Sequence, residues 1–269
     1  MNSHSIFKWV TLILASLVLL FIIAPLTGMF IHTSFGDIIK TANDSEVQRS
    51  IWLTLTVAFF STLIFAVGAL PLAWLMARRN FPLKRVVQGV IDLPVVIPHT
   101  AAGIALLGFI SRDGLLGGMA ARLGILLVNN AAGIALAMAF VSLPFLINSA
   151  RDGFAAVPEQ IEKAALTLGA SPTRIFFTIS MPLAWRPIVS GFIMMFARGM
   201  SEFGAVVIIA YHPMISPVLI YERFNAYGIN YARPASIIFM AVALFFFILF
   251  RTLATEKRII PRSEDEATD

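Results

Sequence analysis

Six long apolar segments dominate the sequence and constrain its fold more than any other feature. They span residues 9–31, 51–77, 93–110, 124–149, 187–210 and 234–250. A helix needs about 20 mainly apolar residues to cross the hydrocarbon core of a bilayer, and each segment is close to that length or longer. Only 13% of the residues are charged and 58% are hydrophobic, whereas soluble domains carry about 25% charged residues. The sequence therefore predicts an all-α integral membrane protein with six transmembrane helices.

Composition and missing motifs exclude several classes of protein. The chain has no cysteine, so it has neither a disulfide framework nor a cysteine-ligated metal site. It also has no G-x-x-x-x-G-K-[ST] phosphate loop, no HExxH motif and no clustered metal ligands. The net charge of +5 is scattered between apolar segments, which indicates membrane topology rather than nucleic-acid binding. We therefore expect no catalytic residue, metal or cofactor in this chain and no nucleic-acid partner, with the lipid bilayer as its surroundings.

Basic residues predict how the segments are oriented in the membrane. The loop after the second segment has no acidic residue and four basic ones, Arg78, Arg79, Lys84 and Arg85. Loops rich in Lys and Arg face the cytoplasm, and successive spans alternate, so residues 150–186 and both termini then lie inside. The loops outside are 32–49, 111–123 and 211–233. We predict a multi-pass protein of the cell membrane with both termini cytoplasmic, which Lys8 and the Lys257–Arg258 pair support.

Prolines and small residues indicate helices that bend and pack closely. Prolines lie within or beside the segments at Pro25, Pro71, Pro94, Pro98 and Pro144. An interior proline breaks a helical hydrogen bond that neighbouring helices must compensate. The sequence AAGIAL occurs at 101–106 and again at 131–136; close packing of small residues accounts for it, with duplication as the alternative. We predict one transmembrane domain, residues 1–260, and a short acidic tail, residues 261–269.

A polar segment, residues 162–182, interrupts the apolar pattern between the fourth and fifth spans. Its sequence is EKAALTLGASPTRIFFTISMP. Pro158 favours the first turn of a helix that continues to about Leu168, and Gly169 suits the C-terminal cap of that helix. Ser171 then suits the N-cap of a second helix with Pro172 at its first position. The pattern predicts two short helices with a tight bend on the cytoplasmic side.

The polar segment resembles the EAA loop of ABC-importer permeases, whose pattern is E-A-A, three residues, G, nine residues, I, one residue, L-P. Five residues fall on this pattern: Ala164, Ala165, Gly169, Ile179 and Pro182. Met181 replaces the Leu, and Lys163 stands where the Glu is expected, with Glu162 one place earlier. The resemblance implies that an ATPase subunit docks here and that coupling depends on Glu162, Ala164, Ala165, Gly169 and Ser171. An ordinary interfacial amphipathic helix is the alternative.

A second polar motif lies in the fifth span, in FARGMSEFGAVVIIAYHP, residues 196–213. Arg198 and Glu202 are four residues apart and therefore share a helix face. Charges within a span usually face a protein interior or a polar pathway, so this pair either ties helices together, which we favour, or contributes to an anion path. Ser201 and His99 are further candidates for that path. A lone histidine, however, is more often hydrogen-bonded inside a bundle.

Two longer stretches resemble the molybdate/tungstate permease family. They are VIDLPVVIPHTAAGIALL, residues 90–107, and FARGMSEFGAVVIIAYHPMISPVLIYERF, residues 196–224. Sulfate permeases share a related R-x-L-G-E-[FY]-G segment, so part of the match is common to oxyanion importers. The resemblance extends from about residue 50 to 250. It implies a type I ABC importer permease that carries molybdate or tungstate across the cell membrane.

The same resemblance implies a particular assembly. Two copies of the chain form a homodimer around a central path, and two copies of an ABC ATPase subunit, with ATP and Mg, dock beneath, one on each polar segment. An extracytoplasmic substrate-binding protein docks outside. ATP binding draws the two polar segments together and opens the spans outward, and hydrolysis restores the inward-facing state. This is alternating access between two conformers.

Three alternatives stay open at this point. Import of sulfate or thiosulfate places nearly the same demands on a permease. An ion-coupled secondary transporter places functional ionisable residues near the membrane midplane, which suits Arg198, Glu202 and His99 but gives the polar segment no role. A structural membrane scaffold explains neither the prolines nor the polar segment.

Overall fold

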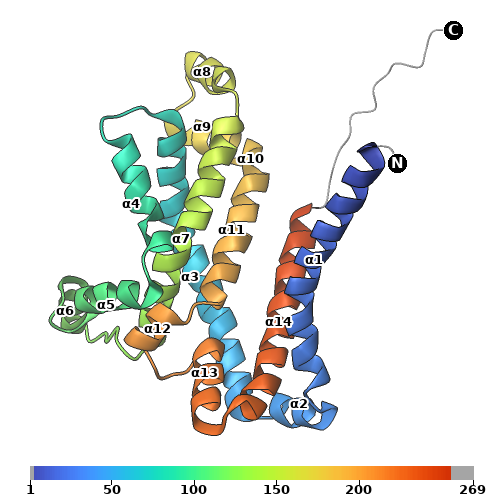
Figure 1. The fold of residues 1–269 in the computed structure, drawn as a ribbon. Helices are drawn as coiled ribbons and strands as arrows, with labels where there is room; N and C mark the ends of the chain where they lie inside the picture. The colour runs from blue at the N-terminus through green and yellow to red at the C-terminus, as the bar shows by residue number, and fades with distance from the viewer. Residues whose placement is uncertain (1–2, 256–269) are drawn as a thin grey trace. The chain divides into compact units, whose positions relative to one another are not determined.

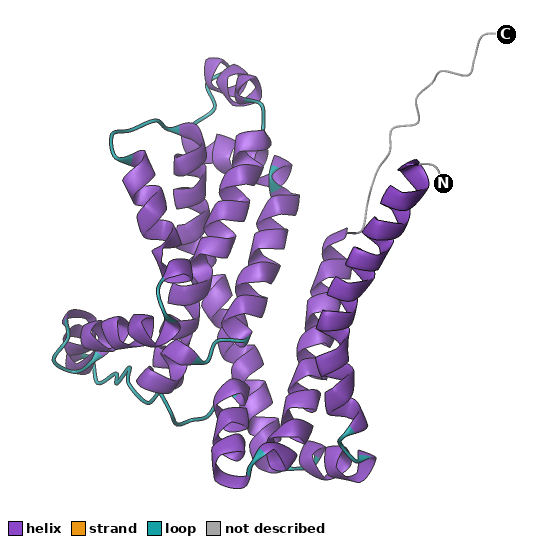
Figure 2. Cartoon of the chain, viewed as in Figure 1, coloured by secondary structure: helices purple, strands orange, loops and turns teal. Residues whose placement is uncertain are grey.

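The computed structural model describes residues 3–255 of the chain. The predicted acidic tail, residues 261–269, and the Lys257–Arg258 pair lie outside the described residues. Within residues 3–255 the chain forms helices joined by loops and contains no strand (Figure 2). The predicted all-α fold is therefore confirmed.

The helices are named as in Figure 1. They are α1 (Ser3–Ile31), α2 (Phe35–Ala42), α3 (Ser45–Arg78), α4 (Lys84–Val96), α5 (His99–Ile110), α6 (Leu115–Arg122), α7 (Ala131–Ala156), α8 (Glu159–Thr167), α9 (Pro172–Ile175), the π-helix η1 (Phe176–Ser180), α10 (Met181–Leu183), α11 (Trp185–Met200), α12 (Gly204–Ile209), α13 (Ser216–Tyr227) and α14 (Ile229–Thr255). Among the described residues, four helices, α1, α3, α7 and α14, are long and apolar enough to cross a membrane. Two bent pairs raise the number of candidate spans to six.

The third predicted span, residues 93–110, is broken rather than continuous. The axes of α4 and α5 differ by 112° across the break. Ile97 is extended, with φ −74° and ψ 148°, and Pro98 precedes the first residue of α5. The cause is local, because the proline ring disfavours the helical conformation of the residue before it and supplies no N–H for the helix.

The fourth and fifth predicted spans also differ from the observed helices. The fourth, residues 124–149, begins as a helix only at Ala131, where the Asn130 side chain accepts the Ala132 N–H and caps α7. The fifth, residues 187–210, is divided, since α11 ends at Met200 and α12 is a separate short helix. The predicted outer loops 32–49, 111–123 and 211–233 contain the helices α2, α6 and α13.

The chain divides into two compact units, and α3 and α14 contribute to both. Unit 1 comprises residues 1–52 and 215–242, and unit 2 comprises residues 53–214 and 243–269. Within unit 1, Arg223 Nη2 lies 2.6 Å from Asp44 Oδ2. Burial alone raises the pKa of Asp44, but the hydrogen bonds from Arg223 and the Glu46 N–H outweigh it and hold that pKa below its ordinary value.

Unit 2 has a core of small and large apolar residues from α3, α7 and α11. Its buried members include Ala66, Ala69, Ala73, Ala139, Leu146, Ala150, Phe154, Ile188 and Met195. Small residues allow helix backbones to approach closely. A Cβ on Gly191 of α11 would lie 2.8 Å from the Cβ of Ser149 on α7. Close contact between α7 and α11 therefore depends on the absence of a side chain at this position.

The repeated AAGIAL sequence has a packing role in unit 2. Gly103, in the first copy, faces α12, because an added Cβ would lie 2.9 Å from the Ala205 Cα. Gly133, in the second copy, lies closest to the Leu127 carbonyl of the preceding loop, and an added Cβ would also lie 3.1 Å from Ile209 Cγ2 on α12. Both copies thus place a glycine against the same short helix, as the packing interpretation requires.

Candidate coupling and translocation sites

The polar segment begins with the two short helices that its sequence predicts, α8 and α9, and then continues through η1 and α10. Helix α8 ends at Thr167, and Gly169 follows in the left-handed region with φ +85°. A glycine adopts this conformation without the steric penalty that other residues meet. The Ser171 hydroxyl then accepts the Arg174 N–H and caps α9, with Pro172 at its first position. The predicted caps and bend are confirmed.

Glu162 is buried beneath α8 and is held by an arginine from another helix. Arg78, at the end of α3, donates from Nε to Glu162 Oε2 at 2.9 Å and from Nη2 to Oε1 at 2.8 Å. The exposed fractions of the two side chains are only 7% and 10%. Arg78 Nη2 also donates to the Val157 carbonyl at 3.0 Å, and Ser180 Oγ donates to Glu162 Oε1 at 2.7 Å. We call Arg78, Glu162 and Ser180 the anchor cluster.

The anchor cluster keeps the Glu162 carboxylate ionised. Burial alone raises the pKa of Glu162, but the hydrogen bonds from Arg78 and Ser180 and the charge of Arg78 outweigh it. The pKa of Glu162 therefore lies below its ordinary value. At neutral pH the carboxylate is charged and accepts two hydrogen bonds from the guanidinium, so it fixes α8 to the end of α3.

The outer face of α8 is small and apolar. Ile161, Ala164 and Leu168 are exposed and lie at positions i, i+3 and i+7, which share one helix face. The exposed fractions of Ile161 and Leu168 are 44% and 88%. Ala165 is half-buried beside this face, and Gly169 is exposed with open space around it. The sequence-predicted residues thus separate, with Glu162 directed inward and Ala164 outward.

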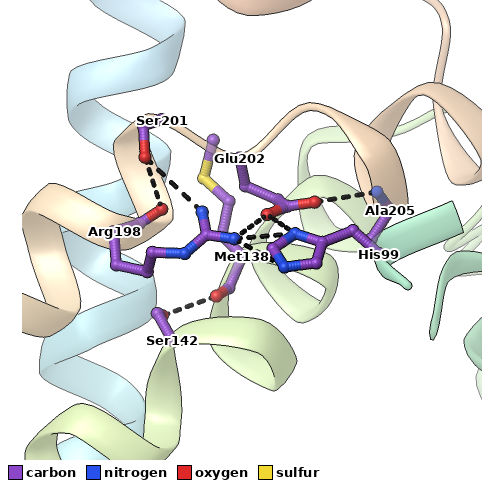
Figure 3. Close-up of polar contacts among 7 residues, drawn as sticks. All are labelled: His99, Met138, Ser142, Arg198, Ser201, Glu202 and Ala205. Carbon is purple, nitrogen blue, oxygen red and sulfur yellow. Dashed lines mark hydrogen bonds and ion pairs between the residues drawn. The ribbon is translucent and has the colours of Figure 1, made fainter. Parts of the chain in front are cut away.

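A second polar cluster joins α5, α11 and the start of α12 (Figure 3). Arg198 Nη2 lies 2.9 Å from Glu202 Oε2, which confirms the pairing that their spacing predicts. His99 Nδ1 lies 2.7 Å from the same Oε2 atom and 2.7 Å from Arg198 Nη2. Glu202 is completely buried, whereas the side chains of Arg198 and His99 are 25% and 34% exposed. We call His99, Arg198 and Glu202 the shared-carboxylate cluster.

The shared-carboxylate cluster can satisfy its contacts in more than one way. If Nδ1 of His99 donates to Glu202, Arg198 Nη2 can donate to His99 Nε2, which lies 3.0 Å away. In the other tautomer Nδ1 accepts from Arg198 and makes no hydrogen bond to Glu202. The second carboxylate oxygen, Oε1, accepts the Ala205 N–H at 2.8 Å and caps α12. Ser201 is exposed beside the cluster, with its Oγ 3.1 Å from the Arg198 carbonyl. Glu202 thus binds Arg198, His99 and the N-terminus of α12.

The two clusters are connected along the chain through α11, which follows the helical end of the polar segment after a bend of 78°. The polar segment leads into α11, and α11 ends two residues after Arg198. Within unit 2, α8 lies at one end of the bundle and α12 lies toward the other (Figure 1). Among the described residues, no group of three or more His, Asp or Glu side chains has an arrangement that could hold a metal ion.

Sequence reasoning missed the partners that lie far apart in the chain. Arg78 is 84 residues from Glu162, and His99 is 103 residues from Glu202. Arg78 served only as a marker of topology, although an arginine at the end of a span is also placed to reach the adjacent loop. For His99, Pro98 gives a signal, because a helix break there puts His99 at the first turn of a new helix.

Comparison with known proteins identifies the family. Residues 69–258 match the family described as binding-protein-dependent transport system inner membrane component. The molybdate/tungstate transport system permease protein WtpB of Pyrococcus abyssi is 41% identical over 89% of this chain and 92% of its own length. A probable sulfate transport system permease protein cysT of Chlorokybus atmophyticus is 31% identical over 91% of this chain and 88% of its own length.

A solved structure shows the same fold. The chain superposes with a TM-score of 0.74 on a chain of a bacterial alginate ABC transporter, solved in complex with an alginate pentasaccharide-bound periplasmic protein. The match covers 93% of this chain and 94% of the other at 15% identity. The bent membrane helices, the capped polar segment and these similarities lead to one assignment. The chain belongs to the family of binding-protein-dependent transport system inner membrane components.

Proposed function

We propose that this chain is the permease subunit of an ATP-driven ABC importer that carries molybdate or tungstate across the cell membrane. Four archaeal relatives named as molybdate/tungstate permeases share 39% to 41% identity over most of the chain. The sulfate permease relative is 31% identical, so sulfate or thiosulfate is the weaker alternative. The permease itself is not an enzyme.

The single observation that carries this proposal is the outer face of α8. A helix that presents Ala164 between Ile161 and Leu168 lets a partner backbone approach closely and bury apolar surface. We propose that an ABC ATPase subunit, which binds ATP and Mg, docks on this face. In a homodimer of this chain two α8 helices are presented, and two ATPase copies are required. We propose that the polar segment and both termini lie on the cytoplasmic side, in agreement with the basic loop after α3.

The anchor cluster supplies a path for force from α8 to the spans. A bidentate arginine–carboxylate pair is geometrically rigid, so displacement of α8 moves the end of α3 through Arg78 and Glu162. The same displacement reaches α11 through the continuous chain after Gly169 and Ser171. ATP binding and hydrolysis thereby shift the spans between outward-facing and inward-facing conformers.

The shared-carboxylate cluster is proposed to line the translocation path. Arg198 is a partly exposed cation, His99 is a partly exposed imidazole, and Ser201 adds an exposed hydroxyl beside them. Arg198 and His99 already bind the Glu202 carboxylate. An oxyanion must compete with that carboxylate, so its contacts with them are weak and readily exchanged. Weak contact suits an importer in which an extracytoplasmic substrate-binding protein selects the anion and the permease releases it.

An ion-coupled secondary transporter is the alternative from a different class. The shared-carboxylate cluster gives that alternative ionisable residues within the candidate spans. A secondary transporter, however, gives no reason for the exposed apolar face of α8. We retain one transmembrane domain, residues 1–260, and an acidic tail, residues 261–269, as predictions.

Docking on α8 can be tested by cross-linking, because the natural chain has no cysteine. Ala164→Cys places a single thiol on the proposed docking face, and Lys163→Cys places one on the same helix but on a different face. With a cysteine introduced in its docking groove, the ATPase subunit should cross-link to Ala164→Cys and at least several-fold less to Lys163→Cys. Equal yields from both variants, or none from either, would contradict docking on this face.

A further inference from the structure

A large basic pocket in unit 2 lies outside both clusters. It has a volume of about 800 Å³ and is formed by the end of α3, the start of α4 and the end of α7. Its lining residues are Met76, Ala77, Asn80, Phe81, Leu83, Lys84, Arg85, Gln88, Arg151 and Ala155. Among these described residues three are cationic and none is acidic. We call this cavity the basic pocket.

The cations of the basic pocket are only partly neutralised by the protein. Lys84 Nζ lies 3.3 Å from the neutral Asn80 Oδ1 atom. Arg151 Nη2 lies 2.7 Å from Asp152 Oδ1, but the Asp152 side chain is 69% exposed and screened by solvent. Arg85 is exposed in the first turn of α4. The basic pocket therefore concentrates positive charge that a bound anion would balance.

The start of α4 adds to this positive potential. A helix N-terminus carries roughly half a positive charge, and acidic residues are preferred in its first turn. Here the first turn of α4 has no acid and begins instead with Lys84 and Arg85. Leu83 before them is in the left-handed region, with φ 67°, and gives no side-chain cap. The unfavourable placement of two cations at this end is relieved when an anion binds.

A hydrogen-bond network between α4 and α7 fixes one wall of the basic pocket. Gln88 Nε2 donates to Asp92 Oδ2 and to Asn148 Oδ1, each at 2.8 Å. Asn148 Nδ2 donates to Asp92 Oδ1 at 2.7 Å, and Arg151 Nη1 donates to Gln88 Oε1. The side chain of Arg151 is thereby held at the pocket wall, which reduces the entropy that a ligand must remove on binding.

The remaining surface indicates an amphipathic ligand. Half of the pocket lining is apolar, from Met76, Ala77, Phe81, Leu83 and Ala155. Next to it, α4 exposes Val86 and Val90, with exposed fractions of 58% and 63%, four residues apart on one helix face. A small free oxyanion leaves most of 800 Å³ unfilled, whereas a lipid covers both the charges and the apolar face.

We propose that the basic pocket binds an oxyanion group, and that its occupant is the phosphate headgroup of an anionic phospholipid. Basic pockets between transmembrane helices on the cytoplasmic side bind such headgroups, and the loop that contains Lys84 and Arg85 is on the predicted cytoplasmic side. The bound lipid joins α4 to α7 at the inner membrane surface. The inference depends on membrane insertion and not on the identity of the transported anion.

Lipid binding can be measured on the full chain in detergent by native mass spectrometry, with phosphatidylglycerol or phosphatidylcholine added. The wild-type chain should retain phosphatidylglycerol in preference to phosphatidylcholine. Lys84→Gln/Arg85→Gln should weaken phosphatidylglycerol binding roughly 25-fold, about fivefold for each cation. Arg112→Gln/Arg122→Gln removes two exposed cations elsewhere in unit 2 and should bind phosphatidylglycerol like wild type. Arg85→Gln alone, at an exposed position, tests the site if the double variant is unstable.

Two outcomes would overturn the assignment. Equal weakening by the α4 and control double variants would show that net charge, not the basic pocket, attracts the lipid. The second outcome combines two results: free phosphate, without phospholipid, stabilises the wild type more than Lys84→Gln/Arg85→Gln, and the wild type shows no preference for phosphatidylglycerol. Together they would assign the basic pocket to a soluble oxyanion.

Discussion

The anchor cluster and the shared-carboxylate cluster are both built on a buried glutamate in unit 2, yet they differ in how completely the charges are enclosed. In the anchor cluster Arg78 and Glu162 are both buried, and the guanidinium binds the carboxylate through two hydrogen bonds. In the shared-carboxylate cluster only Glu202 is buried, and Arg198 and His99 are partly exposed. The anchor cluster satisfies its hydrogen bonds in one arrangement, whereas the shared-carboxylate cluster can satisfy them in more than one.

This difference indicates different roles for the two clusters. A buried pair with every charge satisfied resists change, since removal of one partner leaves an uncompensated charge. A carboxylate shared by two partly exposed bases can exchange contacts with water or an anion at smaller cost. We infer that the anchor cluster transmits movement as a rigid connection, while the shared-carboxylate cluster rearranges during transport.

The largest expected effect comes from breaking the anchor cluster. Arg78→Ala leaves Glu162 buried without its cation and should lower the free energy of unfolding by about 3–5 kcal/mol. Unfolding of the purified chain, followed by circular dichroism, measures this loss. Arg79→Ala, at the exposed neighbouring position, should have little effect. Equal losses in the two variants would contradict the anchoring role, whereas recovery of stability in Arg78→Met/Glu162→Met would support it.

A smaller loss of stability but a larger loss of transport is expected at the shared carboxylate. Glu202→Gln keeps the shape of the side chain but removes the charge that Arg198 and His99 share. The free energy of unfolding should fall by about 1–3 kcal/mol, and uptake by the assembled importer should fall roughly tenfold, which corresponds to about 1.4 kcal/mol. Normal uptake in this variant would show that the cluster is structural only.

The fold was largely predictable from the apolar segments, and the local caps of α8 and α9 from single residues such as Gly169 and Ser171. The broken third span was less predictable, because Pro94 also lies in the segment and α4 continues through it, so proline alone does not locate the break. The pairing of Arg78 with Glu162 and of His99 with Glu202 could not be read from spacing along the chain, which carries no information on contacts between distant helices; only weaker local signals, such as Pro98 before His99, were present.

Backbone strain at the bend of the polar segment should give an intermediate effect. Gly169→Ala has open space for its methyl group, but its φ of +85° places an L-residue in the left-handed region. The expected loss in the free energy of unfolding is about 1–2 kcal/mol. Gly89→Ala, in the interior of α4 with open space and no such φ, is the matched control and should be neutral or stabilising. Equal effects of both substitutions would mean that the left-handed conformation is unimportant.

Acid should weaken the anchor cluster. This is the smallest of the expected effects, because stability near neutral pH should be unchanged. Because the pKa of Glu162 is lower in the folded chain than its ordinary value of 4.5, its stabilisation is complete above that ordinary value. It is lost as pH falls through the lower folded-state pKa. Unfolding measured from pH 7 to pH 3 should show an acid-dependent loss that is absent from Arg78→Met/Glu162→Met. An identical pH profile for wild type and double variant would contradict this account.

The most direct test of the proposed function is uptake of labelled anion into proteoliposomes that contain this chain, the proposed ATPase partner and the proposed binding protein. The account predicts that molybdate and tungstate enter only when ATP is present on the side of the membrane that carries the ATPase subunits. It also predicts that sulfate enters far more slowly. Uptake driven by an ion gradient without ATP would contradict the importer and favour a secondary transporter. Preferential uptake of sulfate would contradict the substrate assignment while leaving the ATP-driven mechanism intact.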